Sequence, residues 1–579
     1  MSCNADHAVY EMENFMDYEI LKAAIIIIGG FAAFAVFVYW NKRTQKEQRM
    51  ARIRARYGKI PEREYSLEEF HAISRYYRLK ETEGFSIDDI TWNDLDMDRI
   101  FQDINHTWSC VGESVLYDML RRPLMEEEEL ERRERLIAYM ASHEKEREEM
   151  QYEFSMNGRT GKYSVFDYIY NLAEFTPGKA SEHFLCIGLI LLAVCLIFWN
   201  VGTGVVALIA AAAFSWSRYF AENRRIEPYI ASCRCLLRLL ETAKVLKKWE
   251  KQPELAWEIE KIQNSAGKFK NFAADGRFVV MSGQSGGGIE KVFLDYLNCT
   301  FHLNLLKFNR LVREIRNLND EIYALADGIG LLEAAAAVAS WRQTLADCCT
   351  PEFTDGKQAE FSIVEGCHPL LMHPVANSIS AKRSVLLTGS NASGKSTFLK
   401  MAAVNAILAQ TVHTCAAESY RASYFRVYSS MALRDDITNS ESYFIAEIRS
   451  LKRILDAVGS EGAPVLCFVD EVLRGTNTIE RIAASAEVLK SLKGKDVLCF
   501  AATHDIELTY ILEEDFDNYH FQEEISDEDI RFDYRLYKGR TQSRNAIRLL
   551  KIMGYNPEVI ERADKRAKEL MEGRMLSCW

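Results

Sequence analysis

Residues 385–397, VLLTGSNASGKST, decide the fold of the C-terminal third of this 579-residue chain. Residues 385–388 predict a buried strand, and the run from Phe398 onward has helical character. Between them stands the pattern G-x-x-x-x-G-K-[ST], in the strand–loop–helix setting that this pattern requires. The glycines of such a loop let backbone N–H groups wrap phosphates, and the helix that follows directs its positive end toward them. The stretch therefore predicts an α/β domain that binds a nucleotide.

Each position of this loop has an expected role in binding ATP and Mg²⁺. Lys395 is expected to reach the β- and γ-phosphates, and the Ser396 hydroxyl is expected to ligate Mg²⁺. The nucleotide-binding residues predicted in this way are Gly389, Ser390, Asn391, Ala392, Ser393, Gly394, Lys395, Ser396 and Thr397.

A second apolar run, residues 465–471 (VLCFVDE), begins about 70 residues after the lysine of the loop and ends in two carboxylates. It predicts another strand of the same sheet. Asp470 is expected to hold Mg²⁺, and Glu471 is expected to be the general base that takes a proton from the attacking water.

A third run, residues 496–503 (DVLCFAAT), is followed by His504. A side chain at the carboxyl end of a parallel strand lies on the ligand side of the sheet. His504 is therefore predicted to contact the γ-phosphate. The alternative is a loop histidine with no role in the site.

These three motifs, in this order, resemble the ATPase domain of the MutS family, a branch of the ABC-type ATPases. Other segments resemble family segments as well: Asn391 in the loop, His368 and residues 374–377 before it, and residues 435–447, 474–478 and 537–563 after it. The resemblance covers roughly residues 85–175 and 227–570. It implies the ABC/MutS fold, ATP hydrolysis with Mg²⁺, a dimer, and DNA as a partner in mismatch repair.

The resemblance also implies a residue that acts across the dimer. In the family, the serine of the segment matched by residues 435–447 reaches the nucleotide of the partner protomer, and Ser442 takes its position. Ser442 is therefore expected to be catalytic in a homodimer. The sequence departs from the family at Glu441, where the family has a basic residue, and it shows no match to the mismatch-reading N-terminal domain.

Residues 23–40 are free of charge and long enough to cross most of a hydrocarbon layer of about 30 Å. Residues 41–56 follow with seven basic residues and one acid, so the positive-inside rule places them in the cytoplasm. A cleaved signal peptide is the alternative, and the acidic stretch before residue 23 disfavours it.

A longer apolar region covers residues 184–217 and predicts a helical hairpin in the membrane, interrupted near Asn200, Gly202 and Gly204. Three crossings that start outside leave residues 218–579 in the cytoplasm, where ATP is. A buried helical pair in a soluble core is the alternative reading of this region.

The fold class expected from these features is an α/β P-loop ATPase domain of ABC/MutS type, C-terminal to an all-α core domain, with three transmembrane helices. The expected domains are an anchor with a basic stretch (1–56), the first part of the helical core (57–183), the membrane hairpin (184–217), the second part of the core (218–350), the ATPase domain (351–545) and a helical dimerisation element (546–579). The expected location is the cell membrane, with several crossings and a cytoplasmic ATPase domain.

The net charge and the cysteine pattern limit the kinds of ligand and the kinds of function that the chain is expected to have. The net charge of −12 disfavours a protein that coats nucleic acid without specificity. The fourteen cysteines include no paired CxxC array, which favours reduced thiols over a zinc site. Two functions remain open. One is a membrane-anchored ATPase that binds mismatched or branched DNA, and the other is a membrane machine that uses the same engine without DNA.

Overall fold

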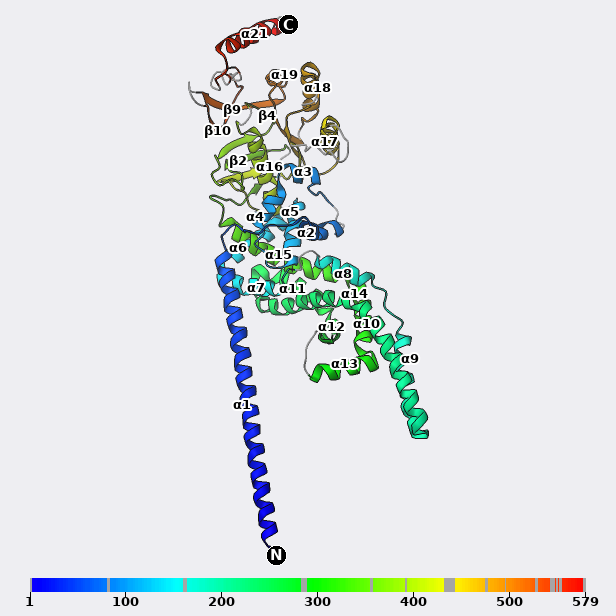
Figure 1. Cartoon of the computed structure of the whole chain (residues 1–579). Helices are drawn as coiled ribbons and strands as arrows, with labels where there is room; N and C mark the ends of the chain where they lie inside the picture. Colours follow the sequence, from blue (N-terminus) through cyan, green and yellow to red (C-terminus); the bar gives the residue numbers. More distant parts are fainter. Residues whose placement is uncertain are drawn as a thin grey trace.

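The structure is a computed structural model of the whole chain. It describes residues 3–80, 84–159, 164–282, 289–354, 358–390, 393–431, 443–473, 477–494, 496–525, 530–541, 547, 550 and 554–575. A long N-terminal helix, a helical core, a pair of sheets with their helices and a C-terminal helix follow one another along the molecule (Figure 1).

The helical half contains α1 (Cys3–Arg56) and the core helices. The core helices are α2 (Leu67–Leu79), α3 (Asp89–Asp94), α4 (Met97–Ile104), α5 (Cys110–Arg121), α6 (Glu127–Ser142), α7 (Glu144–Asn157), α8 (Val165–Glu174), α9 (Ala180–Trp199), α10 (Val201–Leu246), α11 (Pro253–Gly267), α12 (Lys270–Ser282), α13 (Ile289–Phe301), α14 (Leu303–Asn317) and α15 (Asn319–Arg342), with a short 3-10 turn at Lys247–Trp249. No strand occurs among the described residues before Glu352, so this half has the all-α character expected of it.

The sheet half contains two sheets. The strands are β1 (Glu352–Phe353), β2 (Phe361–Gly366), β3 (Asn377–Ala381), β4 (Ser384–Thr388), β5 (Ser419–Ala422), β6 (Arg426–Ser430), β7 (Val465–Asp470), β8 (Val497–Ala502), β9 (Phe516–Ile525) and β10 (Ile530–Lys538). The helices are α16 (Lys395–Thr411), α17 (Tyr443–Val458), α18 (Thr478–Ser491), α19 (Leu508–Ile511) and α21 (Pro557–Met575).

The larger sheet has the strand order β10-β9-β4-β8-β7-β6, and only β10 pairs antiparallel to its neighbour. The smaller sheet has the order β1-β5-β2-β3. Strand β8 lies between β4 and β7, so the two strands of the nucleotide motifs are not neighbours. The carboxyl ends of the five parallel strands nevertheless meet at one edge of the sheet, as the sequence predicts.

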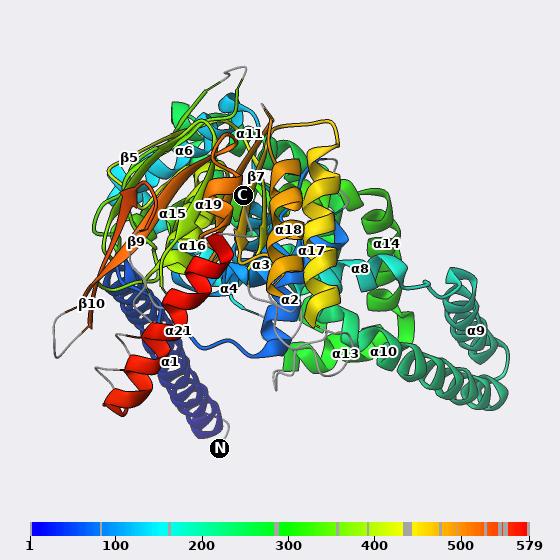
Figure 2. The same cartoon turned by 90° about the horizontal axis from the view of Figure 1, so that it is seen from above.

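The larger sheet is buried on both faces, which explains why its strands read as continuous apolar runs. Alternate residues point to opposite faces: Phe468 and Phe500 join the core that includes α16, whereas Cys467 and Cys499 join a second core with α17 and α18. Accordingly, α17 and α18 lie on the side of the sheet opposite α16 (Figure 2).

Two element boundaries differ from the expectation in the nucleotide domain. The helix after the loop begins at Lys395 rather than Phe398, and the second strand ends at Asp470, so Glu471 lies just beyond it. Glu471 has a positive φ of 60°, which turns the chain out of the strand direction.

Buried hydrogen bonds join helix α3 of the helical core to the end of strand β6. The Asp94 carboxylate accepts hydrogen bonds from the Ser429 hydroxyl at 2.7 Å and from the Met431 N–H at 3.0 Å. The Thr91 hydroxyl accepts from the Ser429 N–H at 3.2 Å. Because Thr91, Asp94 and Ser429 are buried, these bonds join α3 firmly to the sheet just before residue 432.

The hairpin expected at 184–217 is present as α9 and α10, but its break is narrower than expected. Only Asn200 separates the two helices, and its side chain caps α10 by accepting from the Thr203 N–H. Gly202 and Gly204 lie inside α10. A Cβ on Gly204 would stand 2.4 Å from the Ile197 backbone nitrogen, so this glycine lets the two helices approach closely.

Three described helices are long and apolar enough to cross a membrane: Ala180–Trp199, Val201–Trp249 and Asn319–Arg342. The third is α15, which is buried in the helical core. The first two form the hairpin. The expected anchor at 23–40 lies within α1, which is one continuous helix through the basic stretch to Arg56, and the side chains before Ile28 lie outside the described part.

Candidate functional site

The loop between β4 and α16 has a backbone that only glycine adopts readily at its two ends. Gly389 has a φ of 146° and Gly394 a φ of 106°. A Cβ on Gly389 would also stand 2.9 Å from the Phe521 carbonyl oxygen. The two fixed glycines of the motif therefore meet real conformational requirements. Asn391 and Ala392 lie outside the described residues.

The Lys395 side chain folds back over this loop. Its Nζ donates to the carbonyl oxygens of Gly389 and Ser390, at 2.9 Å each, and lies 3.5 Å from His504 Nε2. Lys395 is buried, with 5% of its surface exposed. Burial holds the ammonium group over the middle of the loop, where it can meet a phosphate oxygen.

The two residues expected to hold Mg²⁺ are in direct contact. The Ser396 hydroxyl donates to Asp470 Oδ2 at 2.5 Å. Ser396 is the second residue of α16, and Asp470 is the last residue of β7. A hydroxyl and a carboxylate are hard oxygen ligands of the kind that Mg²⁺ prefers, and a nucleotide and water complete its shell in such sites. The donor set at this position therefore fits Mg²⁺.

Glu471 and His504 come together beside the lysine. Glu471 Oε1 lies 2.6 Å from His504 Nε2, and the Glu471 N–H donates to the Ala502 carbonyl at 3.0 Å. Because both side chains follow neighbouring strands, β7 and β8, the parallel register brings them to the same edge. The pairing places a carboxylate, an imidazole and an ammonium group within one site.

Sequence reasoning missed the residue that steadies the segment after β8. Arg481, on α18, pairs with both oxygens of Asp505 at 2.9 and 2.6 Å, and the hydrogen bonds raise the pKa of the arginine. Asp505 N–H also donates to the Thr503 hydroxyl at 3.0 Å. Nothing in the sequence around Arg481 indicates this contact, since the two residues are 24 positions apart.

Two predicted parts of the site lie outside the described residues. They are Ser442, with the rest of residues 432–442, and the loop at 474–476. The described residues on either side of the first gap are Met431, which follows the last residue of β6, and Tyr443, which begins α17.

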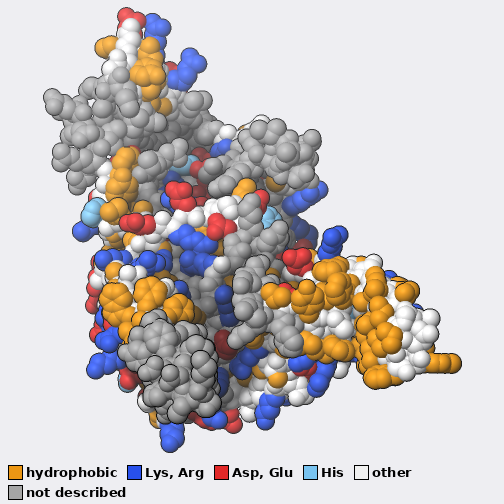
Figure 3. All heavy atoms as spheres, turned by 60° about the horizontal axis from the view of Figure 1, so that its bottom comes forward, with side chains coloured by type: hydrophobic (Ala, Val, Ile, Leu, Met, Phe, Trp, Pro, Cys, Tyr) orange, Lys and Arg blue, Asp and Glu red, His pale blue; other side chains and the backbone are white. Residues whose placement is uncertain are grey.

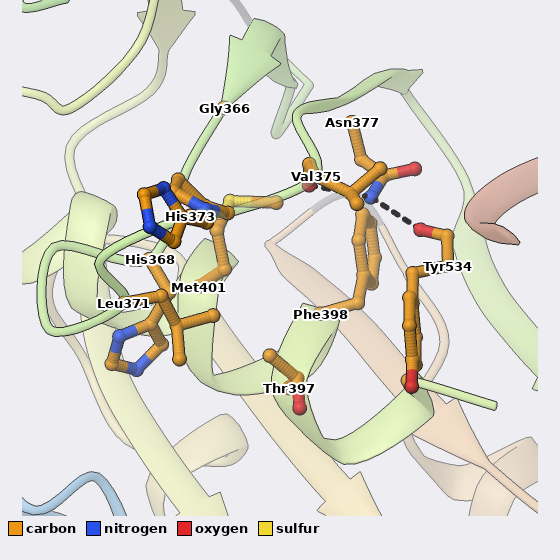
Figure 4. A pocket seen from close by; sticks show the side chains of 12 residues that line it. Gly366, His368, Leu371, His373, Val375, Asn377, Thr397, Phe398, Met401 and Tyr534 are labelled. Atoms are coloured by element: carbon orange, nitrogen blue, oxygen red, sulfur yellow. Dashed lines mark hydrogen bonds between the residues drawn. The ribbon is translucent and has the colours of Figure 1, made fainter. Parts of the chain in front are cut away.

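A cavity of about 210 Å³ adjoins the start of α16 (Figure 4). Its lining residues come from the segment between β2 and β3, from α16 and from β10: Gly366, His368, Leu371, His373, Pro374, Val375, Asn377, Gly394, Thr397, Phe398, Met401 and Tyr534. Burial lowers the pKa of His368 to about 4, so its ring is neutral at pH 7. Flat neutral and aromatic rings beside a phosphate loop suit the base of a nucleotide.

Tyr534 is a lining residue that sequence reasoning could not find. It belongs to β10, more than 130 residues after the other lining residues in the sequence. Asn377 holds its backbone in place. Asn377 Nδ2 donates to the Tyr534 carbonyl at 2.9 Å, and Asn377 Oδ1 accepts from the Leu536 N–H at 2.8 Å. The resemblance had pointed to His368 and to residues 374–377, and the structure places both at this cavity.

Comparison with known proteins agrees with this geometry. The family model described as MutS domain V matches residues 385–571, which contain all of the motif residues named above. The human MutS protein homolog 4 is 29% identical over 279 residues, covering 45% of this chain and 29% of that protein. The DNA mismatch repair protein MutS of Rickettsia bellii (strain RML369-C) is 32% identical over 236 residues, covering 38% of this chain and 26% of that protein.

The DNA mismatch repair protein MutS of Aquifex pyrophilus is 29% identical over 282 residues, covering 46% of this chain and 32% of that protein. The chain thus spans about a third or less of the length of these curated relatives. The range matched by the family model, residues 385–571, contains the glycine loop and the paired carboxylates. Through this domain, the chain belongs to the MutS family.

Proposed function

We propose that this protein is a membrane-anchored MutS-type ATPase that binds ATP with Mg²⁺ and hydrolyses it as a dimer. The observation that carries the proposal is the convergence of Lys395, Asp470, Glu471 and His504 at one edge of the sheet, around a loop whose glycines are conformationally required. Those groups supply a phosphate-binding cation, a metal ligand and a base.

Each group has one task in this proposal. Lys395 exchanges its two carbonyl contacts for phosphate oxygens, which bind an ammonium group more strongly because they are charged. Glu471 takes the proton of the attacking water, and His504 holds that carboxylate in position through the 2.6 Å contact. Ser396 and Asp470 would hold Mg²⁺, which would neutralise negative charge at the phosphates.

The hairpin supports the membrane part of the proposal. Helix α9 buries only His183, Cys186, Ile190 and Ala193, a single narrow stripe, and leaves its other apolar side chains on the surface. Phe198 and Trp199 are each 88% exposed. Figure 3 shows these hydrophobic side chains gathered over the projecting hairpin. A helix that is apolar all round is expected in a lipid environment.

Helix α1 supports the same conclusion from another element. Phe34, Phe37 and Trp40 are each at least 60% exposed, and no described helix covers them. In Figure 1, α1 and the hairpin both leave the helical core on the side opposite the sheets. In this proposal one bilayer on that side takes up both, and the basic residues after Trp40 favour a cytoplasmic location for the sheets.

The partners in this proposal are a second copy of the chain, a lipid bilayer and DNA. The second copy would bring Ser442 to the nucleotide, because one phosphate loop leaves the γ-phosphate open on one side. DNA enters through the likeness to proteins named for mismatch repair. A second candidate function, a membrane machine without DNA, is favoured by the hairpin, which occupies a position where the helical core would otherwise continue.

The dependence of DNA affinity on salt separates the two functions. If DNA is a partner, the detergent-purified protein binds a mismatched or branched duplex, and log K falls with log[salt] at a slope of about −0.9 per phosphate contacted. The measurement is a fluorescence-anisotropy titration at several salt concentrations, with a perfectly paired duplex as the control. Absence of measurable binding to either duplex at low salt would leave the machine without DNA as the function, whereas equal, salt-dependent binding of both would show a DNA-binding protein that does not select mismatches.

Binding of the nucleotide base can be tested at the cavity beside α16. Tyr534→Ala is expected to weaken ATP affinity by about 5- to 150-fold, because stacking of a base on an aromatic ring contributes about 1–3 kcal/mol. Tyr537→Ala, on the same strand but outside the cavity lining, is the matched control. Titration with a fluorescent ATP analogue gives both dissociation constants. Equal effects of the two substitutions would remove Tyr534 from the site.

A further inference from the structure

A second cavity lies at the base of the hairpin, where α9 begins and the apolar part of α10 ends. Its volume is about 130 Å³, which is about four times the share of one water molecule in the liquid. Its lining includes three cations, Lys179, Arg218 and Arg225, and two carboxylates, Glu182 and Glu222. The lining therefore carries a net charge of +1 (three minus two) before any histidine is counted.

One buried nitrogen in this lining has no partner within the part of the chain that the structure describes. His183 is 6% exposed, and its Nε2 has no hydrogen bond. A Cβ on Gly178, another lining residue, would stand 3.9 Å from this nitrogen and 2.9 Å from Glu222 Oε1. His183 Nε2 is thus on the cavity side of the ring, and a buried polar atom left without a partner costs about 1–3 kcal/mol.

The other nitrogen of the ring is held by a chain of hydrogen bonds. His302 Nε2 lies 3.0 Å from the Ser215 hydroxyl oxygen and 3.2 Å from the Ser215 carbonyl oxygen. When the Ser215 hydroxyl donates to this nitrogen, His302 Nδ1 carries the hydrogen and donates to His183 Nδ1 at 3.0 Å. His183 Nε2 then carries the hydrogen of its own ring, and this is the arrangement in which it offers an N–H donor to an anion in the cavity.

The start of α9 adds to the attraction for an anion. Lys179 precedes this 20-residue helix and its side chain makes no cap hydrogen bond, and Lys179, Glu182 and His183 line the cavity, so the positive end of the helix dipole lies beside it. The carboxylates do not fill the site. Glu182 pairs with Arg218 and Glu222 with Arg225, but the side chains of both arginines are at least half exposed, and such pairs contribute little and rearrange easily.

A metal ion is a poorer occupant than an anion. No group of three or more metal-ligating side chains is found among the described residues, so His183, Cys186 and the glutamates do not converge on one point. The lining combines cations and an imidazole at the positive end of a helix. That combination matches a tetrahedral phosphate group.

We propose that this cavity binds a phosphate group, and that the cavity's position assigns it to the head group of a membrane lipid. The proposal rests on the membrane attachment proposed above, because the apolar part of the hairpin begins at Phe184, directly after His183. Basic pockets between membrane helices, at the cytoplasmic surface, are places where anionic head groups bind. Nucleotide chemistry at the sheets does not involve this site.

The test uses the full-length protein in detergent. Native mass spectrometry and calorimetric titration measure the binding of phosphatidic acid, of phosphatidylcholine and of inorganic phosphate. Lys179→Gln and Arg218→Gln are each expected to weaken phosphatidic acid binding about fivefold, the equivalent of about 1 kcal/mol per cation. His183→Phe keeps an aromatic side chain but removes both ring nitrogens, and it is expected to weaken binding as well.

Arg224→Gln is the matched control, because Arg224 is exposed, adjoins Arg225 and does not line the cavity. Phosphatidic acid binding without inorganic phosphate binding assigns the site to a lipid, and binding of both, lost in the same variants, assigns it to phosphate from either source. If Arg224→Gln weakens binding as much as Arg218→Gln does, or if neither phosphate ligand binds, the proposal is wrong. Flotation with phosphatidylcholine vesicles tests membrane attachment separately, since it does not require the cavity.

Discussion

Lys395→Ala and Glu471→Gln are both expected to abolish ATP hydrolysis, but by different routes. Lys395 gives two hydrogen bonds to the loop and is the only described cation buried against it, so its loss should remove nucleotide binding. Glu471→Gln keeps the shape of the side chain and its contact with His504, so binding should survive. Loss of a positioned general base lowers the rate by about 10²–10⁴-fold.

The measurement combines phosphate release with nucleotide binding on the same preparations. Lys400→Ala is the matched control for the lysine, because Lys400 lies on the same helix and pairs with Asp96 at 2.6 Å instead of facing the loop. Glu487→Gln, an exposed position on α18, is the control for the glutamate. Hydrolysis by Glu471→Gln at the rate of the unaltered protein would show that Glu471 is not the base.

The strand, loop and helix of the glycine-rich motif were predictable from the sequence because they are consecutive along the chain. Strand, glycine loop and helix follow one another within residues 384–411, and the glycine positions and the lysine act through the backbone next to them. Asp470 and Glu471 were predictable because an apolar strand that ends in two carboxylates, downstream of a phosphate loop, is typical of a metal ligand and a base. The structure then places Ser396 against Asp470 and Glu471 against His504, and the sequence could not give these distances.

The rest of the site depends on crossovers between distant strands. Tyr534 reaches the cavity beside α16 because β9 and β10 extend the sheet beyond β4. The order of the strands along the sequence does not predict that β9 lies next to β4. Arg481 meets Asp505 for the same reason. The sequence predicted a break that extended to Gly202 and Gly204, because glycine is a poor helix former. In the structure both glycines lie inside α10, and Gly204 allows α9 and α10 to approach closely.

Two natural cysteines should report whether the hairpin lies in lipid. Cys195 on α9 and Cys348 after α15 are both exposed on the protein surface. Although Cys348 is on the surface, the protein around it desolvates the thiol and raises its pKa, which lowers its reactivity at neutral pH. In open membrane fragments, a membrane-impermeant maleimide should nevertheless modify Cys348 and leave Cys195 unmodified.

The physical reason is the low dielectric environment that the hairpin requires. A charged reagent does not enter the hydrocarbon layer, and a thiol in that layer does not ionise. Peptide mapping by mass spectrometry reads both sites in one sample, and denaturation in strong detergent before labelling should expose Cys195 and equalise the two. Modification of Cys195 in the intact fragments at a rate equal to that of Cys348 would mean that α9 faces water, and the exposed apolar surface of the hairpin would then have to be covered by protein.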